Sequence, residues 1–437
     1  MSYKPPLSAR PSTRPTSSYP PLLPIFPPPV AALPHPLPSA PAPRPFPNPR
    51  YIVSTHVVPA AYLRTMPLAS TPPPAAPAYT ASKTERKSRH AERAAWVVAE
   101  SQRERGRHER VLWSAVNRYV RADVANGRGG GLTLFLAHAN GFPKETWEPT
   151  LLHLFDTLGG ALVDEIWAWE APHHGASFLL NADIPFSACD WVDNARDVLT
   201  FLLHFLPSSI AGPDEPLPVH LPRVAPEERA LRKVRGFKER ELLAVGHSFG
   251  GCCCSWAALT HPRLFSSLML VDPVIISSVP LEKDNPGPSL LAGAVARRET
   301  WASREEAHAS FATNPFFAAW DPRVLTLYVA HGLSPAPGGG VQLAMPGVQE
   351  ALVWDMLPEL EERIELRWVV PGKPGEPELG GPGATQERVW RRPANSSNVR
   401  IPQAGHLIAQ EAPRELAREI AEMIERKYMN VDVKPRL

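Results

Sequence analysis

Cysteine is scarce in this sequence: the 437 residues contain four cysteines, and three of them, Cys252, Cys253 and Cys254, are adjacent. Adjacent cysteines on a helix cannot be bridged to one another comfortably, so a disulfide framework of the secreted type is excluded. With Cys189 they also lack the spacing of a zinc or redox motif. We therefore expect a reducing compartment, no metal and no cofactor, with positions 252–254 serving as small buried side chains.

Acidic residues are missing from the first 84 positions, and long apolar runs are missing from the whole sequence. Residues 1–84 carry seven Lys or Arg and no Asp or Glu, although the whole chain has a formal net charge of +2. The remainder is therefore mildly acidic. No apolar run approaches the length of a membrane span, and the balanced total charge leaves no basic footprint for nucleic acid. We expect neither an integral membrane span nor a nucleic-acid partner.

Proline is abundant where acid is absent, since the first 50 residues hold 18 of the 53 prolines. Proline fixes φ and lacks an N–H, so such a segment forms no helix or central strand. It also buries too little apolar surface to offset its ordering entropy. We expect residues 1–50 to be disordered, with polyproline II character. The prolines also disfavour a mitochondrial transit peptide, which needs an amphipathic helix.

A candidate nucleophile lies in the pentapeptide Gly-His-Ser-Phe-Gly at 246–250. The apolar run 242–245 precedes it and a helix-like segment, 252–259, follows it. Strand, Gly-x-Ser-x-Gly and helix are the context of a nucleophile elbow, a sharp turn that lifts a serine hydroxyl above a sheet. We predict that Ser248 is the nucleophile; the alternative is a Gly-rich turn with an incidental serine.

A histidine near the C-terminus is the candidate base, because folds with this elbow order their triad serine, acid, histidine. His406 follows a strand predicted at 398–402 and precedes a helix predicted at 413–428, whose apolar residues recur at steps of three and four. Histidine suits a general base because its ordinary pKa is close to neutrality. The alternatives are that His406 is an ordinary loop residue, or that His247 reacts; we expect His247 to pack beside the elbow.

The oxyanion hole is predicted to consist of two backbone N–H groups. One belongs to Phe249, directly after the serine. The other belongs to the loop that follows a strand predicted at 132–137, at Asn140 or Phe142, and the sequence leaves that choice open. We expect His138, in the same loop, to be a structural hydrogen-bonding residue.

Together these segments resemble the α/β-hydrolase superfamily over about residues 110–428. More narrowly, the chain is similar to fungal α/β hydrolases of the peroxisomal lipase and toxin-biosynthesis type, at residues 51–56, 138–145, 193–197, 246–251 and 271–273. The resemblance implies an α/β fold with a mostly parallel central sheet, helices on both faces and a helical lid. It also implies a serine hydrolase that acts on carboxylic esters.

Two residues compete for the acid of the triad. The usual position follows the strand predicted at 364–370, where the chain offers Glu376 and no aspartate. Some relatives place the acid after the strand that follows the nucleophile helix, here 268–271, which ends in Asp272. We prefer Asp272, because an aspartate that ends a buried strand must find a partner. Glu376 is the alternative, and a cap for the turn before Pro273 is the non-catalytic role for Asp272.

The composition also divides the chain. We expect a disordered segment at 1–50, a first strand and linker at 51–83, a charged insert at 84–109, a hydrolase core at 110–279 with a surface insert at 206–240, a helical lid at 280–360, the second part of the core at 361–429, and a tail at 430–437. The lid carries apolar residues expected to pack in a core or to line an apolar pocket, namely Trp301, Phe311, Phe316, Phe317, Trp320, Leu325, Tyr328 and Trp354.

The predicted function is hydrolysis of a small apolar acyl ester through an acyl-enzyme. Alternatives are acyl transfer or thioester hydrolysis in lipid or secondary metabolism, and a non-catalytic binding protein of the same fold. The last three residues, Pro435, Arg436 and Leu437, resemble the Ser-Lys-Leu peroxisomal address. A peroxisomal import receptor is therefore a predicted partner, and we expect a peroxisomal or cytoplasmic location.

Overall fold

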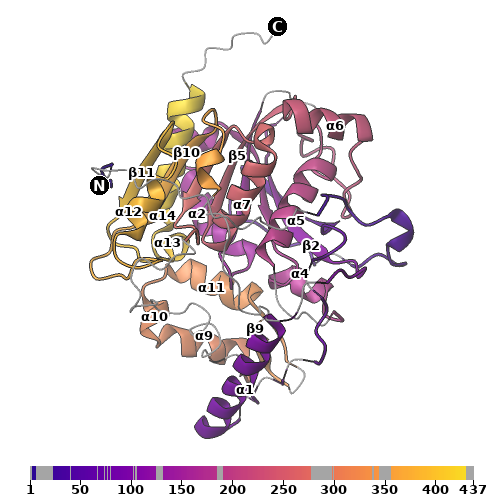
Figure 1. The fold of residues 1–437 in the computed structure, drawn as a ribbon, viewed down its shortest axis with the longest axis vertical. Coiled ribbons are helices and arrows are strands. Elements are labelled where there is room, and N and C mark those ends of the chain that lie inside the picture. Colours follow the sequence, from indigo (N-terminus) through magenta and orange to yellow (C-terminus); the bar gives the residue numbers. More distant parts are fainter. Residues whose placement is uncertain are drawn as a thin grey trace.

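A sheet of eight strands forms the centre of the computed structural model (Figure 1). The strand order is β1-β2-β4-β3-β5-β6-β10-β11, and the bounds are β1 Tyr51–Pro59, β2 Trp113–Arg121, β3 Gly131–Ala137, β4 Val163–Trp169, β5 Arg240–His247, β6 Ser267–Val271, β10 Glu365–Pro371 and β11 Ser396–Ile401. The structure describes residues 2–5, 23–276, 298–336, 339–343 and 356–429, apart from short gaps at 40, 66, 73, 76, 79, 102, 104–105, 125–130, 185–189 and 299.

The sheet is parallel from β4 to β11, and only the pairs β1–β2 and β2–β4 within it are antiparallel. Every residue of β3 and of β4 is buried. Parallel strands covered on both faces tend to have continuous apolar runs, which explains the apolar run of β3 in the sequence. The predicted fold class, an α/β-hydrolase sheet with helices around it, is confirmed.

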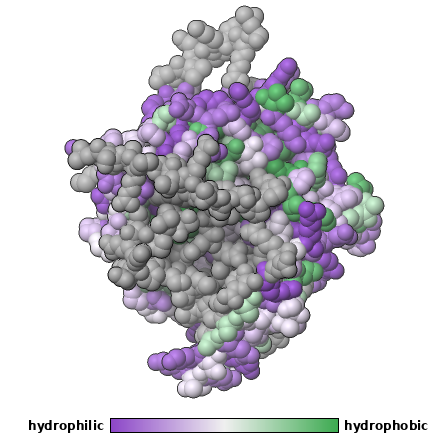
Figure 2. All heavy atoms as spheres, viewed as in Figure 1, coloured by the Kyte–Doolittle hydropathy of each residue, from purple (hydrophilic) through white to green (hydrophobic). Residues whose placement is uncertain are grey.

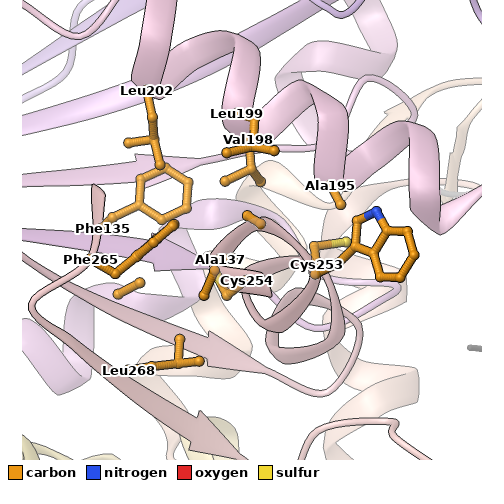
Figure 3. Packing of buried hydrophobic residues seen from close by; sticks show 14 of the residues in the cluster. Phe135, Ala137, Ala195, Val198, Leu199, Leu202, Cys253, Cys254, Phe265 and Leu268 are labelled. Carbon is orange, nitrogen blue, oxygen red and sulfur yellow. The ribbon is translucent and has the colours of Figure 1, made fainter. Parts of the chain in front are cut away.

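Helices cover both faces of the sheet. Along β3, Phe135 and Ala137 face a cluster that includes α5 (Trp191–His204) and α7 (Phe249–Thr260), while Leu134 and Leu136 face one that includes α2 (Glu148–Leu154) and α14 (Pro413–Ile424). Successive side chains of a strand point to opposite faces, so one strand serves both clusters. Figure 3 shows part of the first cluster, in which Cys253 lies toward Ala195 of α5 and Cys254 lies beside Ala137 of β3, both as small buried thiols.

The main domain contains further helices besides α2, α5, α7 and α14. The remaining helices of the main domain are α1 Lys83–Ser101, α3 Leu158–Ala161, α4 Gly175–Leu180, α6 Pro226–Arg235, α12 Ala384–Val389 and α13 Ile408–Glu411. The charged insert expected at 84–109 contains α1, which projects at the lower end of Figure 1 and has a largely hydrophilic to neutral surface in Figure 2. The insert expected at 206–240 contains α6. Among the described residues, no helix is both long and apolar enough to traverse a bilayer.

The described part of the expected lid is helical but also contains a small sheet. Its elements are α9 Arg304–Ala312, α10 Pro315–Ala318, α11 Pro322–His331 and an antiparallel sheet of β7 Thr300–Trp301, β9 Val341–Leu343 and β8 Leu333–Pro335. Trp301, Phe311, Trp320 and Tyr328 form one buried cluster, whereas Phe316 is 58% exposed. Trp354 lies outside the described residues.

The N-terminal segment differs from the disorder expected for residues 1–50 wherever the structure describes it. Ile25 is buried in the core, the carbonyl of Pro24 accepts a hydrogen bond from Arg196 at 2.7 Å, and that of Ile25 lies 3.1 Å from His204 Nε2. Arg44 pairs with Glu148. The physical reason is that proline removes N–H donors but leaves carbonyls. An extended proline-rich chain can therefore satisfy buried side-chain donors of the domain.

Candidate active site

Ser248 sits on a strained turn between β5 and α7. Its φ is 54° and its ψ is −115°, a conformation that non-glycine residues rarely adopt. A Cβ on Gly246 would come within 2.5 Å of the Gly250 carbonyl oxygen, and one on Gly250 within 2.3 Å of the Ala137 carbonyl oxygen. Larger residues cannot replace either glycine without moving backbone. The local sequence therefore builds the elbow that the pentapeptide predicted.

Three residues far apart in the sequence form a hydrogen-bonded relay at this turn. Ser248 Oγ lies 3.0 Å from His406 Nε2, and His406 Nδ1 lies 2.7 Å from Asp272 Oδ2. Ser248 and Asp272 are buried, whereas the His406 side chain keeps 22% of its surface exposed. In this arrangement, His406 can take a proton from the serine while Asp272 holds the imidazole tautomer.

The structure brings Asp272, rather than Glu376, to the histidine. Asp272 follows the last residue of β6, and its backbone N–H donates to the Val369 carbonyl at 2.8 Å. Burial alone would raise the pKa of Asp272, but the hydrogen bond from His406 and the charge of Arg388 outweigh burial and keep that pKa below its ordinary value. Glu376 lies beside Gly405, where an added Cβ would come within 2.7 Å of Glu376 Oε1.

Two side chains, His247 and Glu411, hold the histidine loop through contacts that the sequence did not predict. His247 Nε2 lies 2.9 Å from the His406 carbonyl oxygen, and Glu411 Oε2 accepts the Gly405 N–H at 2.9 Å. Burial, together with repulsion from His406, lowers the pKa of His247 to about 3. His247 is therefore neutral near pH 7 and donates from Nε2, so it anchors the loop in addition to packing beside the elbow.

The candidate oxyanion donors differ in how they are engaged. The Phe142 N–H donates to the Ala139 carbonyl at 3.2 Å, and the Gly141 N–H donates to His174 Nε2 at 2.8 Å. Phe249 is the first residue of α7, so its N–H has no intrahelical acceptor. Within the described part of the chain, the Asn140 N–H also donates to no protein acceptor. The geometry therefore favours Phe249 and Asn140 over Phe142.

His138 ties the oxyanion loop to the elbow. Its carbonyl accepts the Gly250 N–H at 3.1 Å, its Nε2 accepts the Ala171 N–H at 3.1 Å, and its Nδ1 lies 2.8 Å from the Ala139 carbonyl oxygen. Burial lowers the pKa of His138 to about 4, so the ring is neutral and its two nitrogens have fixed roles. This placement agrees with the structural role expected for His138.

Buried charged residues form ion pairs and hydrogen bonds next to the loop that carries Asn140 and Phe142. Lys144 Nζ lies 2.9 Å from Glu145 Oε1 and 3.3 Å from Glu170 Oε2, and Glu170 also accepts the backbone N–H groups of Lys144 and Ser177 at 3.1 and 2.9 Å. Lys144 and Glu145 belong to segment 138–145, which is one of the segments that carry the family resemblance.

In the part of the chain that the structure describes, no group of three or more His, Cys, Asp or Glu residues could hold a metal ion.

Comparison with known proteins agrees with this geometry. The model of the alpha/beta hydrolase family matches residues 134–419. The type I acyl-CoA thioesterase mpaH of Penicillium brevicompactum is 31% identical over 207 residues, which cover 47% of this chain and 41% of that protein. The abhydrolase domain-containing protein AFT2-1 of Alternaria alternata is 35% identical over 95 residues, 22% of this chain and 34% of that protein.

Among solved structures, the peroxisomal alpha-beta-hydrolase Lpx1 of Saccharomyces cerevisiae aligns with a TM-score of 0.57 at 18% identity, covering 89% of this chain and 94% of that one. At this identity the likeness shows the fold alone. The matches to curated relatives span less than half of those proteins' length. The family match covers well over half of this chain, and the fold and the elbow agree with it: the chain belongs to the alpha/beta hydrolase family, in a form similar to fungal members.

Proposed function

We propose that this protein is a serine hydrolase that cleaves carboxylic esters through an acyl-enzyme. The observation that carries the proposal is the relay Ser248–His406–Asp272, with 3.0 and 2.7 Å between its hydrogen-bonding atoms, on a turn whose φ of 54° lifts the serine above the sheet. Backbone strain of this kind costs free energy and clusters at functional sites, so the strained conformation of Ser248 supports a role in chemistry.

The chemistry follows from these positions. His406 takes the Ser248 proton as Oγ forms a bond to the acyl carbon, and the N–H groups of Phe249 and Asn140 stabilise the negative oxygen. His406 then gives its proton to the departing alcohol, and the ester C–O bond breaks. Water attacks the acyl carbon as His406 takes one of its protons, the bond between that carbon and Ser248 Oγ breaks, and His406 returns the proton to Oγ as the carboxylic acid leaves.

The lid favours an apolar acyl group. Phe142 and Leu407, which adjoin the oxyanion loop and His406, belong to the same buried cluster as Trp320 and Tyr328 of the lid. Ring centroids lie 5.3 Å apart for Phe142–Trp320 and 5.5 Å for Phe142–Tyr328. An acyl chain that reaches Ser248 under this lid would meet aromatic and aliphatic surface.

Thioester hydrolysis is the second candidate, because the Penicillium relatives are acyl-CoA thioesterases and the same acyl-enzyme would serve. Acyl transfer differs only in the group that attacks the acyl-enzyme. A non-catalytic binding protein would share the fold but would not react with a reagent that labels an activated serine.

For location we propose the peroxisome with a cytoplasmic remainder, through recognition of Pro435, Arg436 and Leu437. These three residues lie outside the described part of the chain.

Labelling with a fluorophosphonate tests the proposed function, because the reagent reacts with an activated serine. Wild type should be labelled, and Ser248→Ala should lose both the label and turnover of p-nitrophenyl esters. Ser255→Ala is the matched control, since this buried serine of α7 donates to the Gly251 carbonyl at 2.8 Å and, among the described residues, does not contact His406. Turnover of an acyl thioester, measured as the release of free thiol and compared with turnover of the p-nitrophenyl ester, distinguishes a thioesterase from a carboxylic ester hydrolase. An unlabelled wild type would refute the proposal.

A further inference from the structure

A buried arginine contacts the acid of the relay. Arg388 lies on α12, in the excursion between β10 and β11, and none of its surface is exposed. Its Nη2 donates to Asp272 Oδ1 at 2.8 Å, while the other carboxylate oxygen, Oδ2, is held by His406 at 2.7 Å. The two oxygens of one carboxylate are therefore divided between a permanent cation and the imidazole.

The rest of the surroundings of Arg388 do little to satisfy its charge. Its Nη1 lies 3.4 Å from the Leu379 carbonyl oxygen and its Nη2 lies 3.5 Å from Thr385 Oγ1, both long for hydrogen bonds. Its Nε is buried and has no partner among the described residues. A guanidinium stays charged at any ordinary pH, and a buried charge is costly unless it is paired. The fold thus retains a buried cation whose counterion is the acid of the relay.

We propose that Arg388 is a positioning residue of the hydrolytic site, an inference that rests on the proposed function. Its hydrogen bond to Oδ1 fixes the rotation of the Asp272 carboxylate, so that Oδ2 faces His406 Nδ1. Its positive charge also balances part of the negative charge that the carboxylate presents to the imidazole. Arg388 thereby keeps the base aligned with the serine.

The helix that carries Arg388 is itself held by the N-terminus. Trp390 Nε1 donates to the Tyr3 carbonyl at 3.2 Å, and Gln386 Nε2 donates to the Lys4 carbonyl at 3.0 Å. The Thr385 N–H donates to Glu378 Oε2 at 2.9 Å. A helix of six residues has little stability of its own, so these contacts locate the guanidinium against Asp272.

Other charged or titratable groups surround the relay and stay constant when Arg388 is replaced. His406 is faced by His247 from β5 and by Glu411 from α13, and the beginning of the 372–395 excursion brings Lys373 and Glu376 near its loop. Tyr3 interacts electrostatically with Asp272 and Arg388, and also with Glu378 and Arg400. A change in the pH profile between wild type and an Arg388 variant therefore reports the guanidinium.

Kinetics of Arg388→Met and Arg388→Lys test the proposal, with Arg240→Met as the matched control. Arg240 is also buried and paired, with Glu165, but at the start of β5. Arg388→Met should lower kcat by about 10-fold to 100-fold with KM within about 3-fold, and move the acid limb of kcat/KM to higher pH by about half a unit or more. Arg388→Lys should recover most of both effects. Arg240→Met should cost stability and leave the pH profile unchanged.

A second readout is independent of turnover. The Nδ1 proton that His406 shares with Asp272 should give a downfield NMR resonance in wild type, assigned by its loss in His406→Gln, and Arg388→Met should shift or broaden it. A resonance that Arg388→Met leaves unchanged, or an unchanged kcat and acid limb, would overturn the role of Arg388. An unlabelled wild type would refute the proposed function instead, and the NMR comparison would still decide the positioning.

Protein stability gives a third readout if Arg388→Met folds poorly. The double variant Arg388→Met with Asp272→Asn removes both buried charges, so it should regain thermal stability relative to Arg388→Met alone. A double variant whose losses simply add would show that the two side chains are not coupled.

Discussion

Three buried histidines around the proposed site should make the folded protein sensitive to acid. Burial lowers the pKa of His138 to about 4, that of His173 to about 3, and that of His247 to about 3, with positive neighbours adding to the shift for the last two. In the unfolded chain these groups return to an ordinary pKa of about 6.5. The unfolded state therefore binds more protons than the folded state between these values. The stability that the three neutral histidines contribute is fully present above about pH 6.5 and is lost as the pH falls through about 4 for His138 and about 3 for His173 and His247.

The magnitude follows from the size of these shifts. At about pH 5.5 an unfolded histidine is roughly ten parts protonated to one part neutral, while the buried one is still neutral. Each therefore costs about 1.4 kcal/mol relative to neutral pH, and the three together about 4 kcal/mol. That is a large share of the roughly 5–15 kcal/mol that stabilises a typical domain. Glu170 acts in the opposite direction, because burial raises its pKa.

A single-site comparison isolates one histidine from the rest. Urea unfolding, followed by tryptophan fluorescence at about pH 7.5 and about pH 5.5, should show that His247→Gln loses less stability on acidification than wild type, by about 1.4 kcal/mol. Glutamine keeps a donor for the His406 carbonyl but does not titrate. His308→Gln, at an exposed position of α9, is the control and should match wild type. Equal losses of stability in His247→Gln and wild type would show that protonation of His247 does not oppose folding.

Three further predictions concern other parts of the chain. Asp272→Asn should lower kcat by about 10⁴-fold, and it should lower the free energy of unfolding by about 3–5 kcal/mol because Arg388 loses its counterion. Glu376→Gln should change neither quantity by much. Steady-state kinetics and urea unfolding measure both, and a larger effect of Glu376→Gln would contradict the assignment of Asp272. Deleting residues 1–50 should lower the melting temperature, because Arg196 and His204 lose buried acceptors; an unchanged melting temperature would contradict this. A reporter that carries residues 426–437 should appear in puncta with a peroxisomal marker and disperse when Leu437 is removed, and a reporter that stays uniformly cytosolic would remove the localisation proposal.

The fold was predictable because its core strands are buried on both faces. The apolar runs at 132–137 and 242–245 lie in β3 and β5, since a parallel strand covered by helices on both faces is mostly apolar. The elbow was predictable because its glycines have a steric cause. The helix predicted at 413–428 ends as an α-helix at Ile424 and continues as a π-helical turn, Glu425–Met429; such ends depend on local packing that periodicity does not encode.

Features that depend on which strand ends meet in space could not be predicted. The sequence favoured Asp272 over Glu376 only because a buried aspartate needs a partner, and it left Glu376 as the alternative, because the distance from each strand end to the histidine loop is not encoded locally. Arg388 carried no motif at all, because a lone arginine on a six-residue helix looks like a surface residue. The contacts of Pro24 and Ile25 were hidden for a similar reason: the donors they satisfy, Arg196 and His204, lie over 170 residues away.

The two features that the sequence did not reveal, the docked N-terminus and the buried arginine, meet at one helix. Tyr3 and Lys4 accept hydrogen bonds from the side chains of Trp390 and Gln386, in and just after α12, and Arg388 of α12 reaches the Asp272 carboxylate. Because Asp272 in turn holds His406, the alignment of the proposed base depends on a chain of contacts that begins at the third residue. Removing the N-terminal contacts should therefore reproduce, in weaker form, the kinetic effect of Arg388→Met, with Ser248 itself unchanged.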